Sequence, residues 1–161
     1  MQHKEKFHTL ADQYMALVYR VALNCVRTPA DADDVTQNVM LRLLRADPVF
    51  DSAAHARHWF VRVTVNEARR LLTSPWRRRT VSLEELDAVL PSGSPEETLL
   101  LGAVMSLPIK YRLPLYLYYY EGYQANEVAE LLRERPSTIQ TRLARGREKL
   151  KHLIKEDGYD G

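Results

Sequence analysis

Apolar residues recur at helical spacing in almost every segment of this chain, and that recurrence limits the fold more than any other feature. Between Phe7 and Val26 they return every three or four positions, which places them on one face of a helix. Prolines interrupt the pattern at several points, and a proline inside a helix removes a backbone hydrogen bond. With 161 residues, the chain has room for one domain or two small ones. We therefore expect an all-α fold.

Two further helices are predicted in the N-terminal half. Asp31 and Asp34 offer an N-cap acid and a first-turn acid to a helix that runs to about Arg45. Residues 59–65 are rich in β-branched side chains and alternate in character, which suits a strand. The helical spacing continues to Leu71, however, which is too long for a typical strand. The sequence therefore favours a helix there.

The middle of the chain contains a predicted linker and two more helices. Residues 74–94 carry prolines, serines and a glycine with little periodicity, which is typical of a linker. Ser94 is a good start for a short helix. Pro108 opens another helix, and Gly122 closes it. Pro114 lies inside that helix and predicts a kink or a boundary.

The C-terminal part combines a short helix, a tight turn and a longer basic helix. Residues 124–132 form the amphipathic first helix, and residues 133–135 have the length of a turn. Ser137 and Gln140 have capping-box spacing at the start of the second helix. This order predicts a helix-turn-helix, a unit whose second helix enters the major groove of DNA. A surface helix with a solvated basic face is the plainer alternative.

The start and the exposed face of that second helix supply side chains suited to DNA. Serine and threonine hydroxyls bond phosphates or base edges, arginine forks read guanine, and glutamine reads adenine. The candidate residues are Ser137, Thr138, Gln140, Thr141, Arg142, Arg145 and Arg147.

Charge is arranged in blocks, although the net charge is only +2. Residues 57–79 hold seven arginines and one acid, and residues 135–155 hold seven bases and one acid. Residues 80–101, between them, hold five acids and no base. Two cationic blocks flanking an acidic stretch suggest a polyanion held at two places, which favours nucleic-acid binding.

Composition argues against several classes of site. Cys25 is the single cysteine, so an internal disulfide and a multi-cysteine zinc site are excluded. His55 and His58 could share a metal, but a solvated pair is the better interpretation. No apolar run approaches the ~20 residues that cross a bilayer, and the N-terminus leads into no signal-peptide core. We expect a cytoplasmic protein without membrane insertion, metal or cofactor.

Three groups of motifs follow one another in an order typical of one protein family. Residues 31–44 (DADDVTQNVMLRLL) are similar to a helix that binds core RNA polymerase, and residues 58–72 (HWFVRVTVNEARRLL) to one that melts and reads a promoter −10 element. Residues 107–112 (LPIKYR), 120–123 (YEGY) and 139–150 (IQTRLARGREKL) are similar to a unit that reads the −35 element. The chain thus resembles the sigma-70 family of RNA polymerase sigma factors, in its small extracytoplasmic-function (ECF) branch.

This resemblance implies polymerase-binding residues on the helix that follows Pro29. Asp31, Asp34, Gln37 and Arg42 fall where the family docks on the coiled coil of the largest polymerase subunit. Helix capping is a second interpretation for the two aspartates, and both can hold together.

It also implies −10 contacts on the helix that contains residues 58–72. Asn66 falls where the family contacts a base flipped out of the duplex, and Trp59 lies on the same helix face. For Trp59, ordinary core packing is the favoured interpretation. Arg62, Arg69 and Arg70 are expected to bind phosphates more than bases.

The resemblance implies a dissociable subunit that gives RNA polymerase its promoter choice, and not an enzyme. Expected partners are core RNA polymerase, through its coiled coil and flap, and promoter DNA; whether an anti-sigma factor restrains the protein stays open. The implied organisation is region 2 in residues 1–73, a flexible acidic linker in 74–94, region 4 in 95–155 and a disordered tail in 156–161.

Two other functions remain open at this point. A stand-alone helix-turn-helix regulator needs only residues 107–153, but it leaves 31–72 unexplained. A helical interaction protein would use its basic faces on acidic partners. The chain also departs from the family's pattern, because the turn at 133–135 lacks a glycine, Gln124 replaces a better-capping serine, and Arg70 stands where many relatives have an acid.

Overall fold

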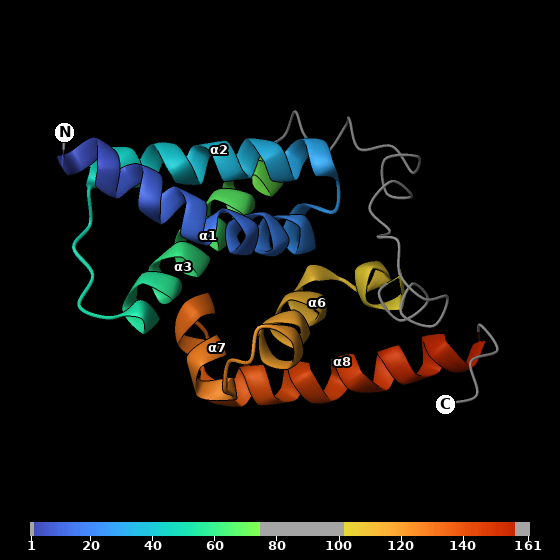
Figure 1. The fold of residues 1–161 in the computed structure, drawn as a ribbon. Helices are drawn as coiled ribbons and strands as arrows, with labels where there is room; N and C mark the ends of the chain where they lie inside the picture. Colours follow the sequence, from blue (N-terminus) through green and yellow to red (C-terminus); the bar gives the residue numbers. More distant parts are fainter. Residues whose placement is uncertain (1, 75–101, 157–161) are drawn as a thin grey trace. The chain divides into compact units, whose positions relative to one another are not determined.

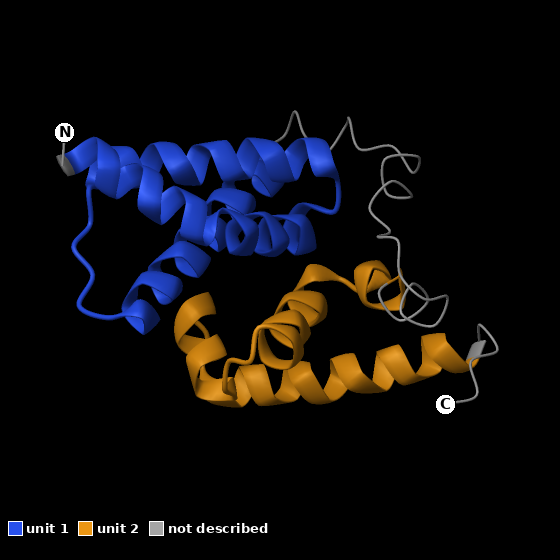
Figure 2. Cartoon of the chain, in the orientation of Figure 1, with its two compact units in different colours: residues 1–89 blue, residues 90–161 orange. Residues whose placement is uncertain are grey.

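The computed structural model describes residues 2–74 and 102–156, and within them every regular element is helical (Figure 1). The all-α prediction is therefore confirmed. The chain divides into two compact units, residues 1–89 and 90–161 (Figure 2). Most of the predicted linker and nearly all of the predicted tail lie outside the described residues.

The first unit is built from α1 (Gln2–Val26), α2 (Pro29–Ala46) and α3 (Ala53–Thr73), each of which packs against the other two. Their apolar faces meet in a core where Val18, Val35 and Phe60 are fully buried. The ring of Tyr14 stacks on that of Phe60 at a centroid distance of 4.5 Å. These contacts join the three helices around one hydrophobic centre.

Helix α2 begins earlier than the sequence predicts. Thr28 is its N-cap, and the backbone N–H of Asp31 donates to the Thr28 hydroxyl at 3.3 Å. Pro29 is the first helical residue, a position where the missing N–H of proline has no helical partner to lose. The prediction of an N-cap acid at Asp31 is therefore wrong, because Pro29 opens the helix.

The ambiguous segment 59–65 is helical, as predicted, and belongs to α3. Ser52 caps this helix by accepting a hydrogen bond from the backbone N–H of His55 at 3.0 Å. The Thr64 hydroxyl donates to the carbonyl of Phe60 at 2.6 Å, so even this buried β-branched residue is satisfied within the helix. Burial of one continuous face outweighs the strand propensity of its residues.

The described part of the second unit begins with helical residues 102–106 and continues through α6 (Ile109–Leu115) into a π-helical turn, η2 (Tyr116–Tyr120). Pro114 has no N–H to donate to the preceding turn, and α6 ends one residue after it. The predicted boundary at Pro114 is confirmed. Gly122 then adopts φ +80°, and the N–H of Tyr123 donates back to the carbonyl of Leu117 at 3.0 Å.

Helices α7 (Ala125–Leu132) and α8 (Pro136–Glu156) form the predicted helix-turn-helix. The turn closes without glycine, because Arg133 takes the left-handed conformation at φ 55° and the N–H of Glu134 donates to the carbonyl of Ala129 at 2.9 Å. Since α8 starts at Pro136, Ser137 lies inside its first turn. The predicted capping box of Ser137 is therefore wrong.

Helices α6 and α8 pack closely against each other in this unit. A Cβ atom at Gly146 would lie 2.9 Å from Cδ1 of Leu115, closer than side chains normally approach. Ile139 and Leu143 of α8 are buried in the same core. Glycine at this position thus lets the two helices come together and fixes where the exposed face of α8 points.

Candidate nucleic-acid interface

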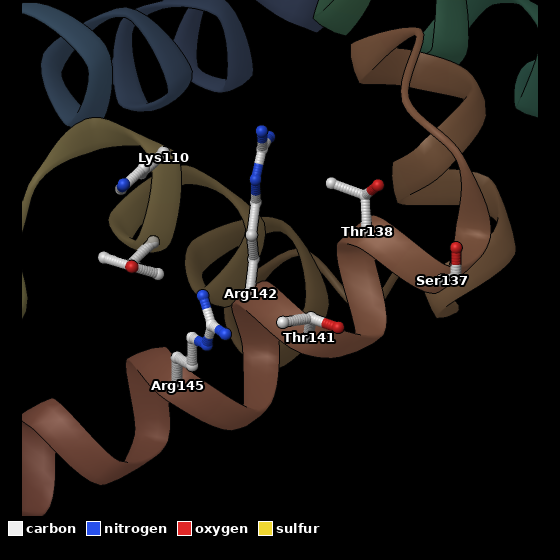
Figure 3. A pocket seen from close by; sticks show the side chains of 7 residues that line it. Lys110, Ser137, Thr138, Thr141, Arg142 and Arg145 are labelled. Carbon is white, nitrogen blue, oxygen red and sulfur yellow. The ribbon is translucent and has the colours of Figure 1, made fainter.

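A cavity of about 350 Å³ opens where the start of α8 meets α6 (Figure 3). Its cationic lining residues are Lys110, Arg142 and Arg145, and the others carry hydroxyl groups. The hydroxyl residues are Tyr111, Ser137, Thr138 and Thr141. Cations and hydroxyl donors on one concave surface are suited to an anion such as a DNA phosphate.

The cations around this cavity lower the pKa of Tyr111. Burial acts to raise the pKa of its phenol, but the charges of Lys110 and Lys149 and hydrogen bonds with Lys110 and Arg145 together lower it from the ordinary value of 10.0. The ammonium groups of Lys110 and Lys149 lie 5.1 Å and 5.5 Å from the ring centroid. The site therefore favours negative charge.

Arg142, the candidate base-reading arginine, has an acidic partner in the free protein. One terminal N–H group of its guanidinium donates to Oε1 of Glu134 across 3.2 Å. The side chains are 25% and 32% exposed, so water screens this ion pair less than a fully exposed one. The guanidinium is thus held beside the turn that precedes α8.

Two other predicted residues of α8 lie outside this cavity. Arg147 donates to the hydroxyl of Tyr119 on η2 at 3.0 Å, and Gln140 is exposed. The structure therefore brings together Ser137, Thr138, Thr141, Arg142 and Arg145, and it separates Gln140 and Arg147 from them.

In the first unit, the exposed face of α2 combines polar and apolar side chains. Asp34 and Gln37 are exposed, and farther along the helix Leu41 and Leu44 are 47% and 40% exposed. Asp31 is buried, at 5% exposure, so it does not share this surface with the others. Leu41 and Leu44 lie three positions apart, so they form one small apolar patch on this face of α2, where a partner protein could bind.

Arg42, the fourth predicted polymerase contact, is held by α3. Its Nε group donates to Oε1 of Glu67 at 2.6 Å, and the terminal N–H of Arg70 lies 3.4 Å from the same oxygen. Glu67 is only 7% exposed. One buried carboxylate thus connects a predicted polymerase-binding residue with a predicted DNA-binding residue.

The predicted −10 residues of α3 lie on one side of the helix, because each follows an earlier member of the set by three or four positions. Asn66, Arg69 and Arg70 are exposed, and Arg62 is half-buried. Trp59 is also half-buried, and its ring contacts Phe60 edge-on at a centroid distance of 5.0 Å. The core interpretation of Trp59 is therefore only half right, since part of this aromatic side chain stays accessible.

Two family models match the chain along the same division. The model described as Sigma-70 region 2 matches residues 10–78, and that described as Sigma-70, region 4 matches residues 98–150. The chain belongs to the sigma-70 family. As a sigma factor of the ECF branch, it directs promoter-specific transcription and binds core RNA polymerase and promoter DNA.

Similar proteins agree with this assignment. The sigma factor is 29% identical to the ECF RNA polymerase sigma factor SigM of Mycobacterium tuberculosis, over 92% of this chain and 76% of SigM. It is 27% identical to the RNA polymerase sigma factor SigV of Bacillus subtilis, over 86% of both chains.

Two solved structures share the fold. The sigma factor RpoE, crystallised with the anti-sigma factor NepR from Bartonella quintana, has a TM-score of 0.72 at 18% identity, covering 94% of this chain and 98% of its own. CnrH, in complex with the cytosolic domain of CnrY, has a TM-score of 0.68 at 23% identity, covering 96% and 90%.

Lys110 and Tyr111 of the sigma factor line the cavity, although the sequence alone assigns them no place in it. They belong to the motif at residues 107–112, but no spacing links them to α8, which follows more than twenty residues later. Only the packing of α6 on α8 brings them to the cavity. Arg112, next in the same motif, is buried and donates to the carbonyl of Leu107 at 2.6 Å, so its role is structural.

No described helix of the sigma factor is long and apolar enough to cross a membrane. Within residues 2–74 and 102–156, no group of three or more metal-ligating side chains comes together.

Proposed function

We propose that this sigma factor docks on core RNA polymerase through the exposed face of α2, reads the −10 element with α3 and reads the −35 element with the start of α8. The observation that carries the proposal is the cavity lined by cations and hydroxyl groups at the start of α8, because it lies on the helix-turn-helix that the region 4 family model matches. This role requires surfaces that bind polymerase and DNA, and it requires no catalytic residue in the chain.

The docking surface on α2 consists of Asp34, Gln37, Leu41 and Leu44. All four are exposed on one helix face, and burial of the two leucines against a partner would supply apolar contact area. Arg42 contributes at the edge of this surface, where Glu67 fixes its direction. Asp31 serves the helix and not the partner, because its side chain is buried.

On α3, Asn66 and part of Trp59 are available to a base, while Arg69 and Arg70 are available to phosphates. A base that leaves the duplex loses a few kcal/mol of pairing and stacking, and an accessible aromatic face offsets part of that cost. We assign the −10 contacts to this face of α3.

The anti-sigma complexes of the two structural neighbours suggest a further partner for this sigma factor. An anti-sigma factor that covers Leu41 and Leu44 would exclude core RNA polymerase from the same surface. A test is competition for a fluorescent form of the full chain: a true anti-sigma factor releases it from core polymerase, and a protein that binds both at once contradicts the shared surface.

The function is tested by adding the purified chain to bacterial core RNA polymerase and transcribing a pool of genomic fragments. We expect new transcripts whose start sites share a pair of upstream motifs at a fixed spacing. Absence of added transcription, or starts without a shared motif pair, would refute the proposal. Tight operator binding without polymerase would instead favour a stand-alone regulator.

The docking surface is tested by co-elution of core polymerase with a Leu41→Ser/Leu44→Ser variant. Because burial of each leucine contributes about 1.5–3 kcal/mol, we expect at least a tenfold loss of affinity. Met15→Ser is the matched control, because Met15 is 44% exposed but belongs to α1. Equal affinity for both variants would contradict this location of the surface.

A further inference from the structure

Glu134 is the acidic residue of the helix-turn-helix turn, and its backbone is fixed. Arg133 turns the backbone by adopting a left-handed conformation, and the N–H of Glu134 donates to the carbonyl of Ala129 at 2.9 Å. From this fixed point the carboxylate reaches Arg142, which lies two turns into α8, at 3.2 Å. A rigid turn therefore holds one end of the ion pair.

The charges around Arg142 explain why this partner matters. Arg145 and Lys110 line the same cavity, and Figure 3 shows the Arg142 side chain extending from α8 among its lining residues. These like charges repel Arg142, and none of the lining residues is an acid that could balance it. Glu134, which is not one of the lining residues, forms the ion pair with Arg142. Glu134 is thus the acid that fixes the direction of this guanidinium.

The bond leaves most of the recognition chemistry of Arg142 available. A guanidinium has five N–H donors, and the bond to Glu134 occupies one of its terminal nitrogens. The remaining donors can still form the two parallel bonds that arginine makes with guanine. An arginine without such an anchor can instead turn to the nearest phosphate, a contact that carries no sequence information.

We propose that Glu134 is a specificity-determining positioning residue, which holds Arg142 toward the base edges and lowers affinity for DNA of any sequence while raising discrimination. The inference rests on the proposed function, because it assigns Arg142 to the −35 element. The carboxylate opposes binding of the DNA polyanion in general, and its bond to Arg142 makes the correct base contact better ordered.

The test compares holoenzyme made with the wild-type chain, with Glu134→Gln and with Glu148→Gln. Glu148 is an exposed acid on α8, so its substitution changes the charge of the same unit equally without touching Arg142. Each holoenzyme selects from a promoter duplex pool randomised around −35. Binding to an unrelated duplex is measured in parallel, at one fixed salt concentration.

We expect Glu134→Gln to bind unrelated duplex a few-fold more tightly and to lose about tenfold discrimination at one −35 position, the scale of one good base contact. Glu148→Gln should show the first effect and keep full discrimination. Undiminished discrimination in Glu134→Gln, or an equal loss in both variants, would overturn the inference.

A second comparison separates positioning from damage to the fold. In an Arg142→Ala background, Glu134→Gln should cause no further loss of discrimination, because the side chain that it positions is gone. A further loss there would show that Glu134 acts by another route. If the wild-type holoenzyme selects no −35 motif, the proposed function itself fails; if only the variant comparison fails, Glu134 alone is wrongly assigned.

Discussion

Glu67 connects two helices through a single carboxylate oxygen, which accepts from Arg42 of α2 and lies within reach of Arg70 of α3. A carboxylate at 7% exposure is costly to bury unless cations or hydrogen-bond donors satisfy it. Arg42 thus stabilises the packing of α2 on α3, and Arg70 helps to satisfy the carboxylate from within α3, besides any contact they make with polymerase or DNA.

We predict that Arg42→Ala lowers the free energy of unfolding by about 1–2 kcal/mol, because it leaves the buried Glu67 with one weaker partner. More than half of the Arg42 side chain is exposed, so the larger values measured for fully buried pairs do not apply. Urea unfolding measures the change. Arg45→Ala, an exposed position on the same helix, should stay within about 0.5 kcal/mol of wild type, and equal losses would contradict this role of Glu67.

Asp47, the C-cap of α2, makes stability depend on acid pH. A hydrogen bond from Lys6, another from His3 and the charges of both lower the pKa of its carboxyl from 3.8. A carboxyl group whose pKa is lower in the folded state than in the unfolded state stabilises the fold at pH values above its ordinary pKa. This contribution disappears as the pH falls through the lowered pKa.

We therefore expect wild type to exceed Asp47→Asn in urea midpoint at neutral pH and the difference to vanish in strong acid. Asparagine tolerates the left-handed φ of 43° at this position, so the substitution removes charge without adding backbone strain. A difference that persists unchanged into strong acid would show that Asp47 acts by other means.

At this scale, sequence reasoning identified side chains but not their partners. The cavity residues Arg142 and Arg145 follow from helical periodicity, which places them away from the core. Asn66 and Arg69, which are exposed, were implied by the family resemblance. The bond between Arg42 and Glu67 joins residues 25 positions apart on different helices, and no local pattern encodes it.

Among the elements, the turn between α7 and α8 departs from common usage, because Arg133 occupies a left-handed position where glycine is usual. A non-glycine residue in this conformation destabilises the fold by roughly 1–2 kcal/mol. Glycine avoids this strain, but it loses more conformational entropy on folding, which cancels part of the gain. We predict that Arg133→Gly is about 0.5–1 kcal/mol more stable than Arg133→Ala in thermal unfolding. Alanine removes the same charge but keeps the strain, so equal stability would contradict the strained turn.

At the contact between α6 and α8, glycine is already present, and we expect its replacement to destabilise the fold. Gly146→Ala gains helix propensity of about 1 kcal/mol, but its Cβ would meet Leu115 at 2.9 Å in a packed core, where overpacking costs about 1–3 kcal/mol. We expect a net loss of stability in urea unfolding. In a Leu115→Ala background the same change should be neutral or stabilising, and a loss there would exclude the proposed clash.

The types of the elements were predictable from sequence, whereas some of their beginnings were not. Helical spacing identified α3 against its strand propensity, and Pro114 marked the end of α6. The start of α2 was misplaced because Asp31 is a good cap residue by type, while Pro29 is the residue that opens the helix. The start of α8 at Pro136 was predicted, but Ser137 lies inside the first turn and is not its N-cap.

At the scale of the whole molecule, the proposed function divides the recognition of a promoter between two units, each of which carries a block of basic residues. Each unit alone would bind DNA weakly and with strong salt dependence, because phosphate contacts dominate such binding. Their attachment to one chain and to one polymerase raises the effective concentration of the second contact after the first has formed. This division predicts that a substitution in one unit alters one promoter element and leaves the other intact.

The most direct test maps the promoter motifs selected by holoenzyme carrying Asn66→Ala or Arg142→Ala. We predict that Asn66→Ala relaxes the sequence preference near −10 only, and that Arg142→Ala relaxes one position near −35 by about 1–3 kcal/mol. Changes by both variants in the same element, or a uniform weakening across all sequences, would contradict the account of two units that read two separate stretches of promoter DNA.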